Sequence, residues 1–214
     1  MNWKMFFIVL TICFCVTSCG TPLVPQRNDK IKQTKEWQDF SQAWDNYNLN
    51  SPHIKPHDGD WKGYFKRIEN CLEKANNLKP LIKQGLISQA ELNAIRWYFN
   101  NLLEISGRQT AVNVNDKEAV NKQAAHGQYR AYNVLNQNLG WLKEIAGQKD
   151  CLDWIKNVWV ASLRGHHLVV LRKTTPETLK YWGKTFWGTT PSMKEVTSLT
   201  DETRKIIETI EKVK

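Results

Sequence analysis

The sequence has no apolar run long enough to cross a bilayer. Met5–Val16, the apolar part of the first twenty residues, contains twelve uncharged residues. As a helix these residues span about 18 Å, whereas the hydrocarbon core of a membrane is roughly 30 Å thick. The sequence also lacks a Gly-x-Ser-x-Gly motif, a glycine-rich phosphate loop and a nucleic-acid-binding motif. The common catalytic signatures are therefore missing, and no nucleic-acid partner is expected.

The first nineteen residues do contain a recognisable order of features. The amino terminus and Lys4 provide a positive start, the short apolar stretch follows, and small residues come next, as in a secretory signal. The run Val16-Thr17-Ser18-Cys19 resembles the lipobox of bacterial lipoproteins. This resemblance implies cleavage before Cys19 and attachment of diacylglycerol to that cysteine. It covers about 20 of the 214 residues and implies nothing about the rest of the chain.

The resemblance also implies a location. Each buried acyl methylene contributes about 0.8 kcal/mol, so one chain binds reversibly and two or three attach the protein stably to a membrane. Gly20 stands where lipoproteins of the inner membrane typically have Asp, which favours the outer membrane of a bacterial envelope. The alternative interpretation is an ordinary secretory signal or an uncleaved anchor that happens to contain cysteines.

The predicted organisation is a signal peptide at 1–18, a lipidated cysteine and tether at 19–28, and one domain at 29–214. Removal of the signal leaves 196 residues, and the net charge falls from +9 to +8 because Lys4 is the only charged side chain lost. A basic surface suits anionic partners such as lipid headgroups, lipopolysaccharide, peptidoglycan carboxylates or an acidic protein. Nine of the ten tryptophans remain, and we expect most of them in the core, although some could line a glycan- or partner-binding groove.

Two cysteines remain besides the lipidated one. Cys71 and Cys151 form an even pair in an oxidising compartment, which favours a disulfide between them. Such a bond would close a loop of about 80 residues and contribute perhaps 4 kcal/mol in the chain-entropy model. Two separate buried thiols are the alternative.

Apolar spacing predicts an all-α, bundle-like domain of about seven helices. Ser88 and Glu91 form a capping box at the start of the best-specified helix. The run Leu168–Leu171 suits either a strand or a helix, and we favour a helix because only Thr110–Val114 could pair with a strand. The predicted helices span residues 29–47, 61–78, 88–106, 116–146, 150–164, 175–186 and 200–213, with a short segment at 81–85.

One carboxylate is a candidate catalytic residue. Glu104-Ile105-Ser106 is weakly similar to the Glu-Ser pair of lytic transglycosylases, in which a buried glutamate with a raised pKa acts as general acid. The downstream Gly-Leu-Met-Gln signature of those enzymes is missing, and Ala125-His126-Gly127-Gln128 is a poor substitute. The resemblance implies Glu104 as the general acid of a peptidoglycan-active enzyme.

Two histidine pairs place metal-capable side chains at close spacing in the sequence. His53 and His57 stand near Asp58 and Asp60, but the intervening prolines argue against the helical geometry of a zinc site. His166 and His167 are adjacent and would point about 100° apart on a helix. We expect surface or structural roles for all four histidines, with no metal and no cofactor.

Two functions of different classes follow from the sequence. The first is a non-enzymatic envelope lipoprotein whose helical domain binds an envelope protein, peptidoglycan or anionic lipid. The second is a peptidoglycan-active enzyme centred on Glu104. A variant of the first is an exclusion lipoprotein that blocks a surface receptor.

Overall fold

The chain folds into helices throughout the part that the structure describes. The computed structural model describes residues 26–50, 60–107, 115–185 and 190–213. All regular secondary structure in these ranges is helical, which confirms the all-α prediction. The elements are α2 (Arg27–Lys32), α3 (Lys35–Asn50), α4 (Trp61–Asn76), α5 (Lys79–Lys83), α6 (Gln89–Gly107), α7 (Lys117–Ala146), η1 (Ile155–Trp159), α8 (Val160–Ser162), η2 (Leu163–Leu168), α9 (Val169–Leu171), α10 (Pro176–Thr185) and α11 (Met193–Lys212). The four elements from η1 to α9 follow one another without a break, and we call residues 155–171 the composite helix.

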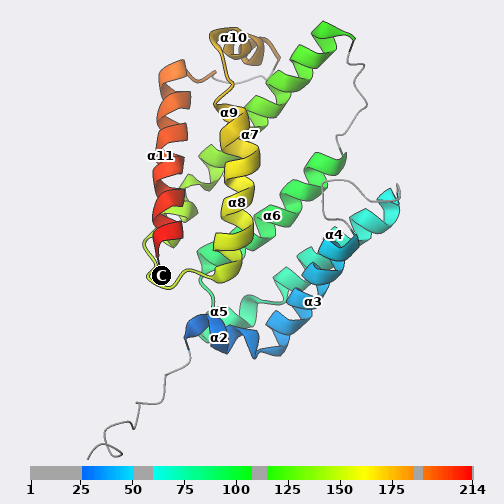
Figure 1. Cartoon of the computed structure of the whole chain (residues 1–214), viewed down its shortest axis with the longest axis vertical. Helices are drawn as coiled ribbons and strands as arrows, with labels where there is room; N and C mark the ends of the chain where they lie inside the picture. Colours follow the sequence, from blue (N-terminus) through cyan, green and yellow to red (C-terminus); the bar gives the residue numbers. More distant parts are fainter. Residues whose placement is uncertain (1–25, 51–59, 108–114, 186–189, 214) are drawn as a thin grey trace, which may run out of the picture.

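Helix α6 connects two groups of helices. It packs against α4, which in turn packs against α3, and on its other side it contacts α7 and the composite helix. Helix α7 also contacts α11 and α10. Figure 1 shows α2 and α5 at one end of the molecule, whereas α10 lies at the opposite end. These two ends are called the α2 end and the α10 end below.

The core is continuous and rich in aromatic side chains. Phe40, Tyr64 and Phe99 are fully buried, and Trp44 stacks on Tyr47 with ring centroids 5.4 Å apart. Most tryptophans in the described ranges belong to this core, as the sequence predicts. Four are buried, three are partly buried and packed against the core, and one is 36% exposed: Trp37, Trp154, Trp159 and Trp182; Trp44, Trp97 and Trp141; and Trp61.

The composite helix resolves the ambiguity at Leu168–Leu171. These residues are helical, and the helix continues through Gly165, where the sequence suggested an end. Two π-helical segments, η1 and η2, interrupt its α-helical ladder. The helix continues because Leu163, Leu168 and Leu171 are buried on one side, and this apolar area outweighs the modest cost of a glycine inside a helix.

One long helix agrees with its prediction and the last helix does not. Helix α7 is unbroken through Gly127 and Gly140, as the predicted helix at 116–146 requires. Helix α11 begins at Met193 and not at Thr200, because Ser192 and Glu195 form a capping box that the sequence analysis missed. Thr200 instead lies inside the helix, buried, with its hydroxyl donating to the Val196 carbonyl at 2.7 Å.

The first predicted helix is divided in two. Helix α2 begins at Arg27, inside the predicted tether, and a break at residues 33–34 separates it from α3. Cys19, the rest of the signal and tether up to residue 25, and the segment Thr110–Val114 lie outside the described residues. None of the described helices is long and apolar enough to cross a membrane.

Candidate functional site

The most elaborate polar site joins the start of the domain to its core. Glu91, in the first turn of α6, is fully buried, and Arg27 of α2 is 14% exposed. The two Nη atoms of Arg27 donate to the two carboxylate oxygens of Glu91 at 2.7 Å each. This bidentate geometry is the strongest form of the arginine–carboxylate interaction.

Backbone amides complete the environment of the buried carboxylate. The N–H groups of Ser88 and Leu152 both donate to Glu91 at 2.8 Å. Burial alone would raise the pKa of Glu91, but the hydrogen bonds from Arg27 and from the two amides lower it below its ordinary value. Glu91 therefore remains charged in the interior, and the predicted capping box is confirmed by the Glu91 N–H donating to Ser88 Oγ at 3.1 Å.

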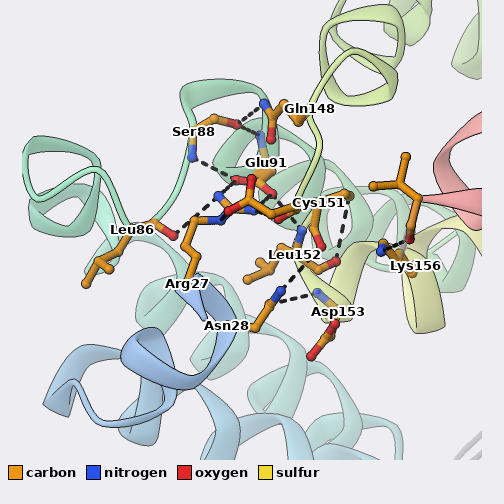
Figure 2. A network of polar contacts seen from close by, with 12 residues as sticks. Arg27, Asn28, Leu86, Ser88, Glu91, Gln148, Cys151, Leu152, Asp153 and Lys156 are labelled. Atoms are coloured by element: carbon orange, nitrogen blue, oxygen red, sulfur yellow. Dashed lines mark hydrogen bonds and ion pairs between the residues drawn. The ribbon is translucent and has the colours of Figure 1, made fainter. Parts of the chain in front are cut away.

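The same site fastens α2 to two other segments. Arg27 forms an ion pair with Asp150 at 3.0 Å and also donates to the Asp150 carbonyl. The Asn28 side chain accepts from the Asp153 N–H at 3.0 Å. Figure 2 shows Arg27 and Asn28 of α2 beside Glu91 of α6 and beside the segment 151–153. We call Arg27, Asn28, Glu91, Asp150 and Asp153 the N-terminal clasp.

Only part of this site could be predicted from the sequence. Glu91 was predicted as a capping residue, a helix was predicted to begin at residue 150, and Arg27 was placed in the tether. Asp150 instead pairs with Arg27, and the composite helix begins after it. The only signal for the role of Arg27 was its charge at the end of the uncharged segment 20–26. Its partner Glu91 is 64 residues away in the chain, so the spacing of residues could not identify the pair.

Glu104 lies in different surroundings from those of a general acid. It is near the end of α6, its side chain is 42% exposed, and Arg130 Nη2 of α7 lies 3.5 Å from its carboxylate. A general acid of the transglycosylase type needs a buried carboxylate that stays protonated. Glu104 is instead exposed and lies beside a guanidinium group. The side chains of Ile105 and Ser106 lie outside the described set.

Arg130 also belongs to a buried network between three helices. Its Nη2 donates to the Asn101 carbonyl at 3.0 Å and to Asn101 Oδ1 at 2.7 Å. The Asn101 amide then faces His167 Nε2 of η2 at 3.2 Å. Because the amide NH₂ is a donor, Nε2 acts as the acceptor, which places the proton of the neutral ring on Nδ1.

The environment of His167 identifies its role. Burial, followed by the charges of Arg130 and His166, lowers its pKa to about 3. The ring is therefore neutral at ordinary pH and joins α6, α7 and η2 through hydrogen bonding. The neighbouring His166 is exposed. The predicted structural and surface roles of this pair are confirmed.

Of the other metal-capable cluster in the sequence, the structure describes only Asp60. Asp60 caps α4 by accepting from the Gly63 N–H at 2.8 Å. His53, His57 and Asp58 lie outside the described residues. Within the described ranges, no three His, Cys, Asp or Glu side chains gather in a geometry that could bind a metal ion.

The predicted disulfide is wrong, because both Cys71 and Cys151 are free and fully buried. Cys71 lies in α4 near the phenols of Tyr47 and Tyr98, whereas Cys151 lies beside the N-terminal clasp. Each thiol is thus packed in its own surroundings, as in the alternative of two separate buried thiols. Burial raises the pKa of each to about 12, so both are unreactive.

A shallow polar groove lies between α3 and α4. Its volume is about 340 Å³, and its lining combines three amides with one carboxylate, one ammonium group and one methyl group: Gln42, Asn46 and Asn70, Asp39, Lys74 and Ala43. The Lys74 ammonium lies 3.5 Å from Glu73. The groove is distant along the chain from Glu104 and shares no lining residue with the N-terminal clasp.

Comparisons with protein families, with curated proteins and with solved structures find no match to this chain.

Proposed function

We propose that this protein is a lipoprotein of the bacterial envelope, anchored through Cys19, whose basic helical domain binds another envelope component. The observation that carries the proposal is the order of features in residues 1–19: positive start, short apolar stretch, small residues and cysteine. The localisation that agrees best with Gly20 is the outer membrane.

The start of the folded domain supports this proposal. Helix α2 begins at Arg27, eight residues after Cys19, and Arg27 forms an ion pair with the buried Glu91. The seven residues between them include Pro22 and Pro25 and suit a spacer between a lipid and a folded body. The anchor and the domain thus occupy separate parts of the chain.

The lipid is tested by mass analysis and by a cysteine substitution. We expect the mature chain to begin at Cys19 with a mass increased by acyl groups, and to fractionate with membranes. Cys19→Ser should abolish the modification and release the chain, whereas Cys15→Ser, within the signal, should change neither. An unmodified mature amino terminus, or a Cys19→Ser chain that stays membrane-bound, would contradict the proposal.

A second experiment addresses the enzymatic alternative. We expect no clearing of cell-wall material in zymograms, either by the native chain or by Glu104→Gln, because Glu104 is exposed and lies near Arg130. Clearing that disappears in Glu104→Gln but persists in Glu118→Gln, a substitution of an exposed glutamate on α7, would establish the enzyme instead.

A further inference from the structure

We infer that the α2 end of the domain contacts the anionic phospholipid headgroups of the membrane to which the protein is anchored. This inference rests on the proposed lipid anchor and adds a specific orientation and a specific partner surface. Three observations carry it: the short connection to Cys19, the attachment of α2 to the domain, and the lysines around it.

The connection limits how far this end can be from the bilayer. Arg27 is the eighth residue after Cys19, so even a fully extended chain reaches only about 28 Å. Helix α7 has thirty residues and is therefore about 45 Å long. The α2 end is thus constrained to the neighbourhood of the lipid anchor, whereas the α10 end is not.

The N-terminal clasp makes this constraint apply to the whole domain. Arg27 and Asn28 bind to Glu91 of α6, to Asp150 and to Asp153. Helix α2 therefore does not act as extra linker, because releasing it would leave the charge of Glu91 buried without its partner. The domain and α2, to which the tether from Cys19 is joined at Arg27, therefore move as one rigid body. We call Arg27 the anchor point of the domain.

Exposed lysines surround the anchor point. The acidic side chains of the clasp region share two cations: Arg27 pairs with Glu91 and Asp150, and Asp29 and Asp153 lie 3.8 and 3.6 Å from Lys32. These four carboxylates exceed the two cations by two charges, which the lysines named next outnumber. Five further lysines of α2, the start of α3, α5 and the loop after α7 are exposed and have no ion pair within the described residues: Lys30, Lys35, Lys79, Lys83 and Lys149.

These charges lie where the field of a membrane acts. An anionic leaflet attracts basic residues only within about a Debye length, roughly 8–10 Å. The tether allows lysines at the α2 end to enter this range, whereas those at the α10 end are about a helix length farther from the lipid anchor. The positive charge at the α2 end therefore acts on lipid, and the α10 end is left free for other partners.

The orientation is measured with single labels on the lipidated full chain in vesicles. Gln84→Cys and Gln123→Cys introduce exposed thiols near the α2 end and on the outer part of α7, and the native Cys71 and Cys151 are buried with pKa values of about 12, so they do not compete for the label. A quencher on the lipid headgroups reports the proximity of each label. With phosphatidylglycerol present, we expect the label at position 84 to be quenched several times more strongly than the label at 123.

Two matched triple variants test the role of the lysines. Lys79→Gln, Lys83→Gln and Lys149→Gln together should abolish the extra quenching that phosphatidylglycerol causes at position 84, as should high salt. Lys117→Gln, Lys173→Gln and Lys180→Gln remove the same charge near the α10 end and should leave it unchanged. All six lysines are exposed, so both variants should fold.

The outcomes separate this inference from the proposed function. Equal quenching at both positions, or quenching at 84 that ignores phosphatidylglycerol and the three lysines, would overturn the inference while the lipid remained demonstrated by mass. A chain without lipid would instead overturn the proposed function. Preferential quenching at 123 would show that the α10 end is the membrane-facing one, contrary to this proposal.

Discussion

At the scale of single residues, one buried charge determines how the chain begins. Glu91 serves two segments at once: its carboxylate accepts from the Ser88 N–H at the start of α6 and from both Nη atoms of Arg27. A carboxylate with no exposed surface is costly unless it is fully paired. The pairing residue, Arg27, is therefore as much a part of the core as the apolar side chains around it.

Removal of that pairing residue should strongly destabilise the fold. We expect Arg27→Ala to lower the free energy of unfolding by about 3–5 kcal/mol, because it leaves Glu91 charged and buried without its partner. Lys122→Ala, which removes an exposed pair with Glu118, should leave stability nearly unchanged. Urea denaturation of both variants decides the matter. A small effect of Arg27→Ala would show that α2 is dispensable and would weaken the N-terminal clasp.

At the scale of helices, local sequence signals fix some helix ends, whereas tertiary packing fixes others. The capping box at Ser88 correctly predicted the start of α6, and the proline in α5 marked the interruption after α4. Gly165 gave a misleading signal, because buried leucines on both sides of it keep the composite helix continuous. Capping residues, prolines and glycines thus determine a helix end only where the burial of apolar side chains does not favour continuing the helix.

Two glycines in contrasting backbones test this distinction. Gly85 has φ +68° in the turn before α6, and Gly140 lies exposed within α7, where an added Cβ would meet open space. We expect Gly85→Ala to cost roughly 1–2 kcal/mol, because the left-handed region is unfavourable for a residue with a Cβ. Gly140→Ala should stabilise the protein by up to about 1 kcal/mol through helix propensity. Thermal unfolding of the two variants should shift in opposite directions; shifts of the same sign would contradict this account.

At the scale of the whole molecule, α6 unites the two groups of helices. Its first turn binds α2 through Glu91, and Asn101, near its end, binds α7 and η2 through Arg130 and His167. The core contacts of α6 extend from α4 to the composite helix. A change at the buried histidine therefore reports on the attachment of one group to the other.

The stability of this attachment should depend on pH. The pKa of His167 is lowered to about 3 in the folded state from 6.5, so the unfolded chain binds the extra proton first. The contribution of the neutral His167 ring to the free energy of unfolding is fully present above pH 6.5 and is lost as pH falls toward 3. The loss between pH 8 and pH 5 is about 2 kcal/mol. His167→Gln should remove this loss, whereas the exposed neighbour variant His166→Gln should retain it. Denaturant titrations across this pH range provide the measurement, and an unchanged slope in His167→Gln would contradict the assignment.

The sequence alone determined the all-helical class, most helix positions and the core location of most tryptophans, whereas the signal before Cys19 stays a prediction. These depend on local order and on spacing along one helix, both of which can be read in a linear sequence. The pairing of Arg27 with Glu91, the free state of Cys71 and Cys151, and the salt bridge of Glu104 were decided only by the tertiary structure. Each depends on which surfaces of distant helices meet, because a buried charge or thiol is defined by its neighbours in space and not by its neighbours in the chain.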